Sequence, residues 1–426
     1  MSQPPNPFIV GRPVPAENFV GRKSDITIAF DQIYNRSHLA IWGSPGMGKS
    51  SFLQKLESPQ TWEEYGLDPQ EAVIVRFSCE SIIPFTPSGF WKEVLICLKS
   101  KLENDPKLQE KIERLLERQE VNKDSFREIL RVIARNNKFL VLLLDDYDLA
   151  LQTNEEYDEH AMQKLLSECR NLAVHSAEGH HLSMIVTSLK RLNELGPGLN
   201  PNASPWYNHY LFLRLKPFNN AEIDQMLRIL RIPDLREATG EVTGGHPALL
   251  QIAGFLLYRD LLSGNAPSVD VFVQDFEEKS QPVFQNIWNR CNEQQQILLI
   301  LISLFNLKGY LHKEKKFDVS GIEFIFSQKE RELTRLQEQG IVTSIVNEDK
   351  TVYSLTSSVM KKWVIQELWN KDEEWLLGRE KVFLNLMSRN QKDKLTKAVK
   401  WLWDNQNKVK PILQSFSKLL TLFSPN

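Results

Sequence analysis

Short runs rich in apolar residues recur along the first half of the chain, and polar or helical sequence separates them. Runs of this length and composition are typical of strands that are buried on both faces of a parallel sheet. Because the intervening segments have helical patterns, we expect an α/β domain with right-handed crossovers. The predicted strands are Leu39 to Gly43, Ala72 to Ser78, Phe139 to Asp145, Leu182 to Ser188 and Tyr210 to Lys216.

After Pro217 the strand pattern stops and helical sequence follows to about Ser280, with Asn219 and Glu222 spaced as a capping box. Three further helical patterns, near residues 294–305, 322–326 and 328–339, precede the runs IVTSIV and TVYSL, which the turn NEDK joins. Three helices and a hairpin in this order predict a winged helix. The predicted parts are therefore an extended segment with a first helix (1–36), an α/β core (37–217), a helical lid (218–282), the winged helix (283–368) and a helical tail (369–426).

Composition limits the class of protein. Of the 426 residues, 42% are hydrophobic, which can supply several cores, yet no apolar stretch approaches the ~20 residues of a membrane span. The amino-terminal stretch has no basic patch followed by an apolar run, so we expect a cytoplasmic protein with no membrane contact. The formal net charge of −2 gives no overall field that attracts nucleic acid. The four cysteines are far apart, so neither disulfides nor a zinc site is expected.

A phosphate-binding motif follows the first predicted strand. The stretch GSPGMGKSS matches GxxxxGK[ST] from Gly43 to Ser50, between a strand and a helix as the motif requires. Its glycines allow the backbone amides to turn toward phosphate oxygens, and the following helix adds its positive end. We expect Lys49 to reach the β- and γ-phosphates of ATP, Ser50 to hold Mg²⁺ and Ser51 to touch the α-phosphate. The other loop residues expected to bind ATP or ADP are Gly43, Ser44, Pro45, Gly46, Met47 and Gly48.

Two carboxylates directly follow the buried strand FLVLLLD, as a metal-assisted phosphate site requires. Asp145 is predicted to hold Mg²⁺, and Asp146 is predicted to orient or deprotonate the attacking water. The alternative for each of the two acids is a solvated acidic turn that caps the next helix. The strand LSMIVTS ends in Thr187 and Ser188. If that strand is inserted between the first and the third, as in ASCE-type P-loop NTPases, Thr187 or Ser188 emerges beside the γ-phosphate; otherwise both residues belong to an ordinary strand end.

These motifs together resemble the AAA+ and STAND groups of P-loop ATPases, in particular members related to origin-recognition ATPases and to NLR-type immune switches. FVGRKSDI is similar to the family motif FVGRExEL, which implies that Val20 and Arg22 help to hold the nucleotide, although Lys23 replaces the usual glutamate. TGGHPALL resembles the GxP signature of the STAND lid. The resemblance implies that His246 and Pro247 approach the base, whereas the local sequence also fits a capped helix with an exposed histidine.

The chain also departs from that pattern. Many STAND proteins carry a histidine in the winged helix that holds ADP, and Ser357 stands at the corresponding position here. No arginine finger is assigned; Arg170 and Arg191 are candidates, and each also fits a surface residue. An arginine finger is worth ~10³ to 10⁵ in rate, so a chain without one in place is expected to hydrolyse ATP slowly.

The sequence therefore supports a slow ATPase that acts as a molecular switch in signalling or defence. Its nucleotide state would control self-association or the binding of a separate effector protein. The alternative is a DNA-directed ATPase of the origin-recognition or transposition-regulator type. Residues 328–339, which would enter a DNA groove, carry equal numbers of basic and acidic side chains, so DNA is the less favoured partner.

Overall fold

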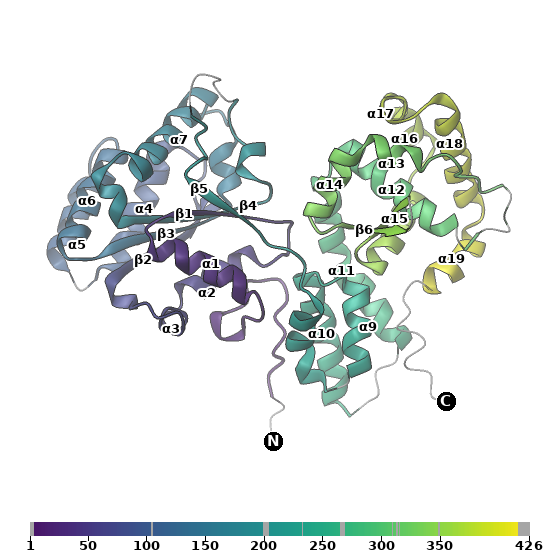
Figure 1. Cartoon of the computed structure of the whole chain (residues 1–426), viewed down its shortest axis with the longest axis horizontal. Helices are drawn as coiled ribbons and strands as arrows, with labels where there is room; N and C mark the ends of the chain where they lie inside the picture. Colours follow the sequence, from purple (N-terminus) through teal and green to yellow (C-terminus); the bar gives the residue numbers. More distant parts are fainter. Residues whose placement is uncertain are drawn as a thin grey trace. The chain divides into compact units, whose positions relative to one another are not determined.

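The computed structural model of the chain describes residues 4–103, 105–198, 204–231, 233–264, 269–308, 310–311, 314, 316–347 and 350–415. The chain divides into two compact units (Figure 1). The sheet unit comprises Pro13–Gly43 and Gly48–Leu215, and the helical unit comprises Met1–Arg12, Ser44–Met47 and Lys216–Asn426. Four residues of the phosphate-binding motif thus belong to the helical unit.

The sheet unit contains a parallel sheet in the order β2-β3-β4-β1-β5. The predicted second, third and fourth strands match in both limits, and the first lies one residue earlier than predicted. The last strand ends two residues early, at Arg214, because only the N–H of Leu215 continues the ladder, to the Trp42 carbonyl at 2.9 Å. The strands are β1 (His38–Trp42), β2 (Ala72–Ser78), β3 (Phe139–Asp145), β4 (Leu182–Ser188) and β5 (Tyr210–Arg214).

Helices cover both faces of this sheet, which explains why β3 and β4 are buried along their whole length and mostly apolar. One face carries α1 (Lys23–Tyr34), α2 (Lys49–Glu57) and α3 (Pro59–Glu64) (Figure 1). The other face carries α4 (Pro87–Lys101), α5 (Pro106–Leu116), α6 (Lys123–Arg135) and α7 (Glu159–Val174), which share one apolar core with the strands.

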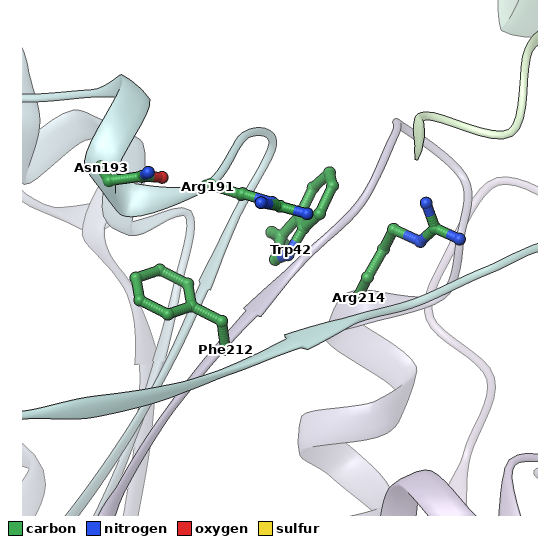
Figure 2. Close-up of a pocket in the computed structure, with 5 residues that line it drawn as sticks. All are labelled: Trp42, Arg191, Asn193, Phe212 and Arg214. Carbon is green, nitrogen blue, oxygen red and sulfur yellow. The ribbon is translucent and has the colours of Figure 1, made fainter. Parts of the chain in front are cut away.

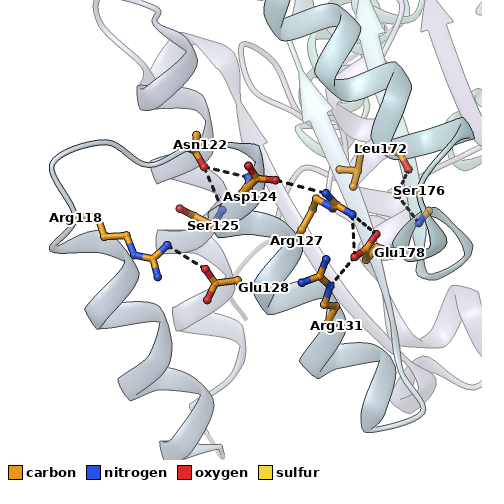
Figure 3. A network of polar contacts seen from close by, with 11 residues as sticks. Arg118, Asn122, Asp124, Ser125, Arg127, Glu128, Arg131, Leu172, Ser176 and Glu178 are labelled. Atoms are coloured by element: carbon orange, nitrogen blue, oxygen red, sulfur yellow. Dashed lines mark hydrogen bonds and ion pairs between the residues drawn. The ribbon is translucent and has the colours of Figure 1, made fainter.

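A polar network joins α6 to the 3-10 turn η5 (Ala177–His181) that precedes β4 (Figure 3). The buried carboxylate of Glu178 accepts hydrogen bonds from Arg131 Nε at 2.6 Å and from Arg127 Nη2 at 3.1 and 3.3 Å. Burial alone would raise the pKa of Glu178, but its own backbone N–H and the two arginines outweigh burial and lower this pKa to about 2. The carboxylate is therefore charged, and it anchors the entry to β4.

The helical unit begins with α8 (Asn220–Leu227), whose predicted capping box between Asn219 and Glu222 is present. Next are α9 (Pro233–Thr243), α10 (Pro247–Leu262) and α11 (Val269–Arg290). α11 continues across residues 282 and 283, where the boundary between lid and winged helix was predicted. The winged-helix pattern follows as α12 (Glu293–Lys308), α13 (Phe324–Gln328), α14 (Glu330–Glu338) and an antiparallel pair, β6 (Val342–Asn347) and β7 (Lys350–Leu355). The later helices are α15 (Ser358–Trp369), α16 (Glu373–Gly378), α17 (Glu380–Leu386), α18 (Arg389–Asp404) and α19 (Gln406–Ser415).

The amino-terminal segment packs on α10 of the helical unit. The N–H of Ile9 donates to Gln251 Oε1 at 2.8 Å, and the Phe8 ring fills the space beside Gly254, where a Cβ would lie 2.2 Å from a ring carbon. A side chain at position 254 would therefore displace the segment. Within the described residues, no helix is both long enough and apolar enough to cross a bilayer.

Candidate nucleotide site

The phosphate-binding loop has the backbone shape that its glycines allow. Gly46 and Gly48 adopt positive φ angles of 78° and 86°, and α2 begins at Lys49 directly after them. Residues with side chains rarely adopt these angles, and such a turn directs successive N–H groups to one side. The Lys49 side chain is buried, and its Nζ donates to the Gly43 carbonyl at 2.8 Å. The motif residues therefore form a compact loop with a lysine held beside it.

The strand order places β4 between β1 and β3, so the predicted insertion is confirmed. It brings Thr187, on β4, next to Asp145 at the end of β3. The buried Thr187 hydroxyl donates to Asp145 Oδ1, and the N–H of Asp146 lies 3.2 Å from both Thr187 Oγ1 and Asp145 Oδ1. The neighbouring Ser188 instead donates to the Lys190 carbonyl at 2.6 Å. Of the two alternatives at this strand end, Thr187 is the residue that contacts the acidic pair.

Asp146 does not cap the turn that follows it. Its backbone is left-handed, with φ of 50°, and no side-chain capping bond is made at the start of η4 (Tyr147–Leu151). Its Oδ2 accepts a hydrogen bond from Ser78 Oγ at 2.8 Å instead. Ser78 was not singled out from the sequence, although the end of β2 pairs with Asp145 in the register of the sheet. The sequence feature that could have identified Ser78 is its hydroxyl at the end of a predicted strand.

A third acid, Asp148, was also not singled out from the sequence. It is buried, and both of its carboxylate oxygens lie 3.0 Å from the N–H of Leu189, directly after β4. Burial raises the pKa of Asp148, while the Leu189 N–H and the charge of Lys49 oppose that rise. Asp148 thus holds the segment that follows Thr187 and Ser188, and it adds negative charge near Lys49.

The stretch TGGHP lies within the helical unit against the four motif residues of that unit. His246 is only 6% exposed, and its Nε2 lies 3.0 Å from the Pro45 carbonyl. The N–H of Ala248 donates to the Gly46 carbonyl at 3.2 Å, and a Cβ on Gly46 would lie 2.6 Å from His246 Cε1. The expected helix start at Pro247 is present, but the histidine is buried and makes no side-chain capping bond. The exposed-histidine interpretation was therefore wrong.

The winged-helix segment contacts the same four residues. Ser44 Oγ donates to the Gln339 carbonyl at 2.6 Å, just after α14. A Cβ on the adjacent Gly340 would lie 3.0 Å from Met47 Cε. Ser357, which stands where a histidine was expected from the STAND pattern, caps α15 by accepting from the Met360 N–H and donates to the Val242 carbonyl. Ser44, Pro45 and Gly46 thus hydrogen-bond either to the start of α10 or to the residue that follows α14.

The remaining predicted residues have the following surroundings. Ser51 Oγ accepts a hydrogen bond from the Val14 N–H at 2.9 Å. Arg22 is buried, adopts a left-handed backbone at the start of α1 and lies 3.4 Å from Asp25. Val20 and Ser50 are half-buried.

The donor set fits Mg²⁺ in its chemistry. The hydroxyl of Ser50 and the carboxylate of Asp145 are hard oxygen ligands, and Mg²⁺ is usually bound by one or two such groups with phosphates and water. Across the described residues there is no group of three His, Cys, Asp or Glu side chains suited to a metal ion.

Both arginine-finger candidates make contacts within the sheet unit. Arg170 Nε donates to Asn208 Oδ1 at 3.0 Å, and the Arg191 guanidinium carbon lies 5.0 Å from the centre of the Trp42 ring. Neither contact identifies its arginine as an arginine finger.

Comparisons with known proteins show likeness in structure and none in sequence. No family model matches the chain, and no curated protein matches it. The Walker-type ATPase PABY2304 of Pyrococcus abyssi is similar over 84% of this chain and 99% of its own, with 16% identity and a TM-score of 0.55. An ORC2 protein of Aeropyrum pernix, in ADPNP and ADP complexes, is similar over 83% of this chain and 97% of its own, with 14% identity and a TM-score of 0.49. An ORC1 protein of the same organism in complex with DNA has 12% identity over 82% of this chain and 93% of its own, with a TM-score of 0.40.

The likeness to PABY2304 shows the fold. The chain shares the P-loop fold of that Walker-type ATPase, with a parallel five-stranded sheet in its described residues and a helical carboxyl-terminal region. The predicted fold class is confirmed. The resemblance to STAND proteins has no support from these comparisons.

Proposed function

We propose that the chain binds ATP with Mg²⁺ and hydrolyses it slowly. The observation that carries the proposal is the hydrogen bond that the Thr187 hydroxyl donates to Asp145. Thr187 lies on β4, which pairs with β1, the strand that leads into the Lys49 loop. A parallel sheet joins ends of strands that are far apart in sequence, so a lysine, two adjacent acids and a hydroxyl gather at one edge. That set suits phosphoryl transfer, in which catalysis is mainly positioning and charge stabilisation.

Each residue has a defined part in this proposal. The loop amides from Gly43 to Gly48 and the Lys49 ammonium would bind the phosphates, and Ser50 and Asp145 would hold Mg²⁺, which supplies charge neutralisation when bound. Asp146 would orient the attacking water, with Ser78 setting the direction of its carboxylate. Thr187 would keep Asp145 in place and lie near the transferred phosphate. Val20, Arg22, Ser51, His246 and Pro247 stay proposed nucleotide contacts.

The test measures nucleotide affinity and turnover in two variants of the full chain. Lys49→Ala should weaken ATP binding by about tenfold or more, because it removes a charge-assisted contact to phosphate. Asp146→Asn should keep the affinity but lower turnover by about a hundredfold or more. Lys55→Ala is the matched control, since Lys55 lies on the same helix and pairs with Glu64. Unchanged ATP affinity in Lys49→Ala would refute the proposal.

We infer a switching output from the contacts of Ser44 to Met47. These residues belong to the phosphate-binding motif, yet they hydrogen-bond to α10 and to the end of α14. A nucleotide that changes the loop must change these bonds, and a ligand shifts an equilibrium when its affinity for the two states differs. Self-association or the binding of an effector would then follow the nucleotide. Mass photometry with ADP, ATP and a non-hydrolysable analogue tests this output, and a mass independent of nucleotide would exclude nucleotide-controlled self-association.

Duplex DNA is the second candidate partner, which would make the chain a DNA-directed ATPase. The observation in favour is the winged-helix pattern itself, with a two-stranded wing and an exposed Arg331 on α14. Arg335 on the same helix pairs with Glu332 at 2.8 Å, which lowers the charge available to phosphate. If DNA binds here, affinity must fall steeply with salt, and Arg331→Ala must reduce that slope by about one. A flat salt response would favour the protein partner.

A further inference from the structure

An open pocket lies at the carboxyl ends of β1 and β5 in the sheet unit (Figure 2). Its volume is about 260 Å³. That is slightly below the ~300 to 1,000 Å³ of pockets for drug-sized ligands, so it suits one or two side chains better than a whole small molecule. Its lining is two arginines, two aromatic rings and one amide: Trp42, Arg191, Asn193, Phe212 and Arg214.

The pocket lining is cationic and contains no acid. Arg191 lies across the Trp42 ring, which supports one face of its guanidinium group (Figure 2). Arg214 is half-buried, and within the described residues its side chain has no hydrogen-bond or ion-pair partner. Guanidinium groups bind carboxylates through paired N–H donors. The charge in this pocket therefore calls for an anionic group.

The pocket adjoins the open edge of the sheet. β5 is the last strand in the order, and its only strand partner in the described part of the chain is β1. The N–H of Leu215 points to β1, and backbone groups alternate in direction along a parallel pair, so those of Phe212 and Arg214 point outward. The side chains of Leu211 and Phe212 are 46% and 37% exposed. An edge of this kind can accept another strand.

We propose that this surface binds an extended acidic segment of a partner protein, which pairs with the outer edge of β5 and places a carboxylate between Arg191 and Arg214. Side chains two apart in a strand share a face, and residues opposite each other on paired strands touch. The segment should therefore carry an apolar residue opposite Phe212 and an aspartate or glutamate two positions away, opposite Arg214. Main-chain bonds give such a complex affinity, and the side-chain pocket gives it specificity.

The test uses a fluorescein-labelled eight-residue peptide that alternates threonine with valine and has aspartate in place of the third valine. A second peptide carries asparagine at that position. The aspartate peptide should bind the full chain about tenfold or more tightly than the asparagine peptide, because charge-assisted hydrogen bonds are lost in the latter. Arg214→Gln should remove this difference. Arg114→Gln, which alters an exposed arginine on α5, should leave it unchanged.

Hydrogen exchange tests the strand pairing separately. The amides of Phe212 and Arg214 should become protected when the aspartate peptide binds, since they point to the open edge. Equal affinity for the two peptides, or an Arg214→Gln chain that still prefers aspartate, would overturn the proposal. So would tighter binding of an eight-nucleotide single strand that Arg214→Gln abolishes, because the pocket would then serve nucleic acid.

Discussion

Replacing Thr187 by valine isolates one hydroxyl at the proposed catalytic edge. Valine has nearly the same volume as threonine, so the fully buried position stays filled and no cavity forms. The substitution removes the hydrogen bond donated to Asp145 and the 3.2 Å contact from the Asp146 N–H. A hydrogen bond to a charged group contributes about 1.5 to 3 kcal/mol. The Asp146 N–H keeps its contact with Asp145, so we expect a loss of about 2 to 3 kcal/mol in the free energy of unfolding.

The same change should also lower ATP turnover. Asp145 and Asp146 lose a group that fixes their positions, and a misplacement of about 1 Å can cost ~10² in rate. We therefore expect turnover to fall by roughly tenfold to a hundredfold, with Thr187→Ser recovering most of it. Turnover at saturating ATP and urea unfolding of the sheet unit are the two measurements.

A matched control lies on the same strand. Ser183 is also fully buried, near the amino end of β4, and its hydroxyl donates to the Ser37 carbonyl at 2.6 Å. Ser183→Ala should cost about 1 to 2 kcal/mol of stability and leave turnover unchanged. If turnover in Thr187→Val stayed within twofold of the natural chain, or fell equally in Ser183→Ala, the role assigned to the Thr187 hydroxyl would be refuted.

Three further predictions concern the loop and the pH dependence of folding. Gly46→Ala should weaken ATP binding more than Gly48→Ala, because both residues have positive φ but only a Cβ at 46 would lie 2.6 Å from His246; equal affinities would contradict this. The pKa of His209 is lowered to about 3, mainly by burial, so the unfolded chain takes up a proton below about pH 6.5 while the folded chain stays neutral. The contribution of His209 to the free energy of unfolding should therefore fall by about 2 kcal/mol between pH 7 and 5. Urea titrations of the His209→Phe variant should lack that part of the decrease. Glu178, with its pKa lowered to about 2, stabilises the fold above pH 4.5, and this contribution is lost as the pH falls from 4.5 to 2. Glu178→Gln should thus lower unfolding free energy by on the order of 2 kcal/mol at pH 7, and the difference from the natural chain should shrink in acid.

The local pattern of the chain determined its strands and the shape of its loop. The runs from 139 to 145 and 182 to 188 are strands with those limits, because a strand buried on both faces is mostly apolar. The run from 72 to 78 is also a strand with the predicted limits, although its buried residues alternate with half-buried ones. The spacing of glycines before Lys49 likewise predicts the turn, since positive φ angles at Gly46 and Gly48 are open to few other residues.

The tertiary structure decided which groups meet. Nothing in LSMIVTS specifies that its strand lies between β1 and β3, because strand order depends on how distant helices pack on the sheet. That order brings Thr187 to Asp145, while the pairing of β2 with β3 brings Ser78 to Asp146. The burial of His246 against Pro45 was equally beyond the sequence, since a local motif carries no information about a partner two hundred residues away. Local sequence patterns determine which segments form helices and strands. Contacts between side chains that are far apart in the sequence depend on how those helices and strands pack.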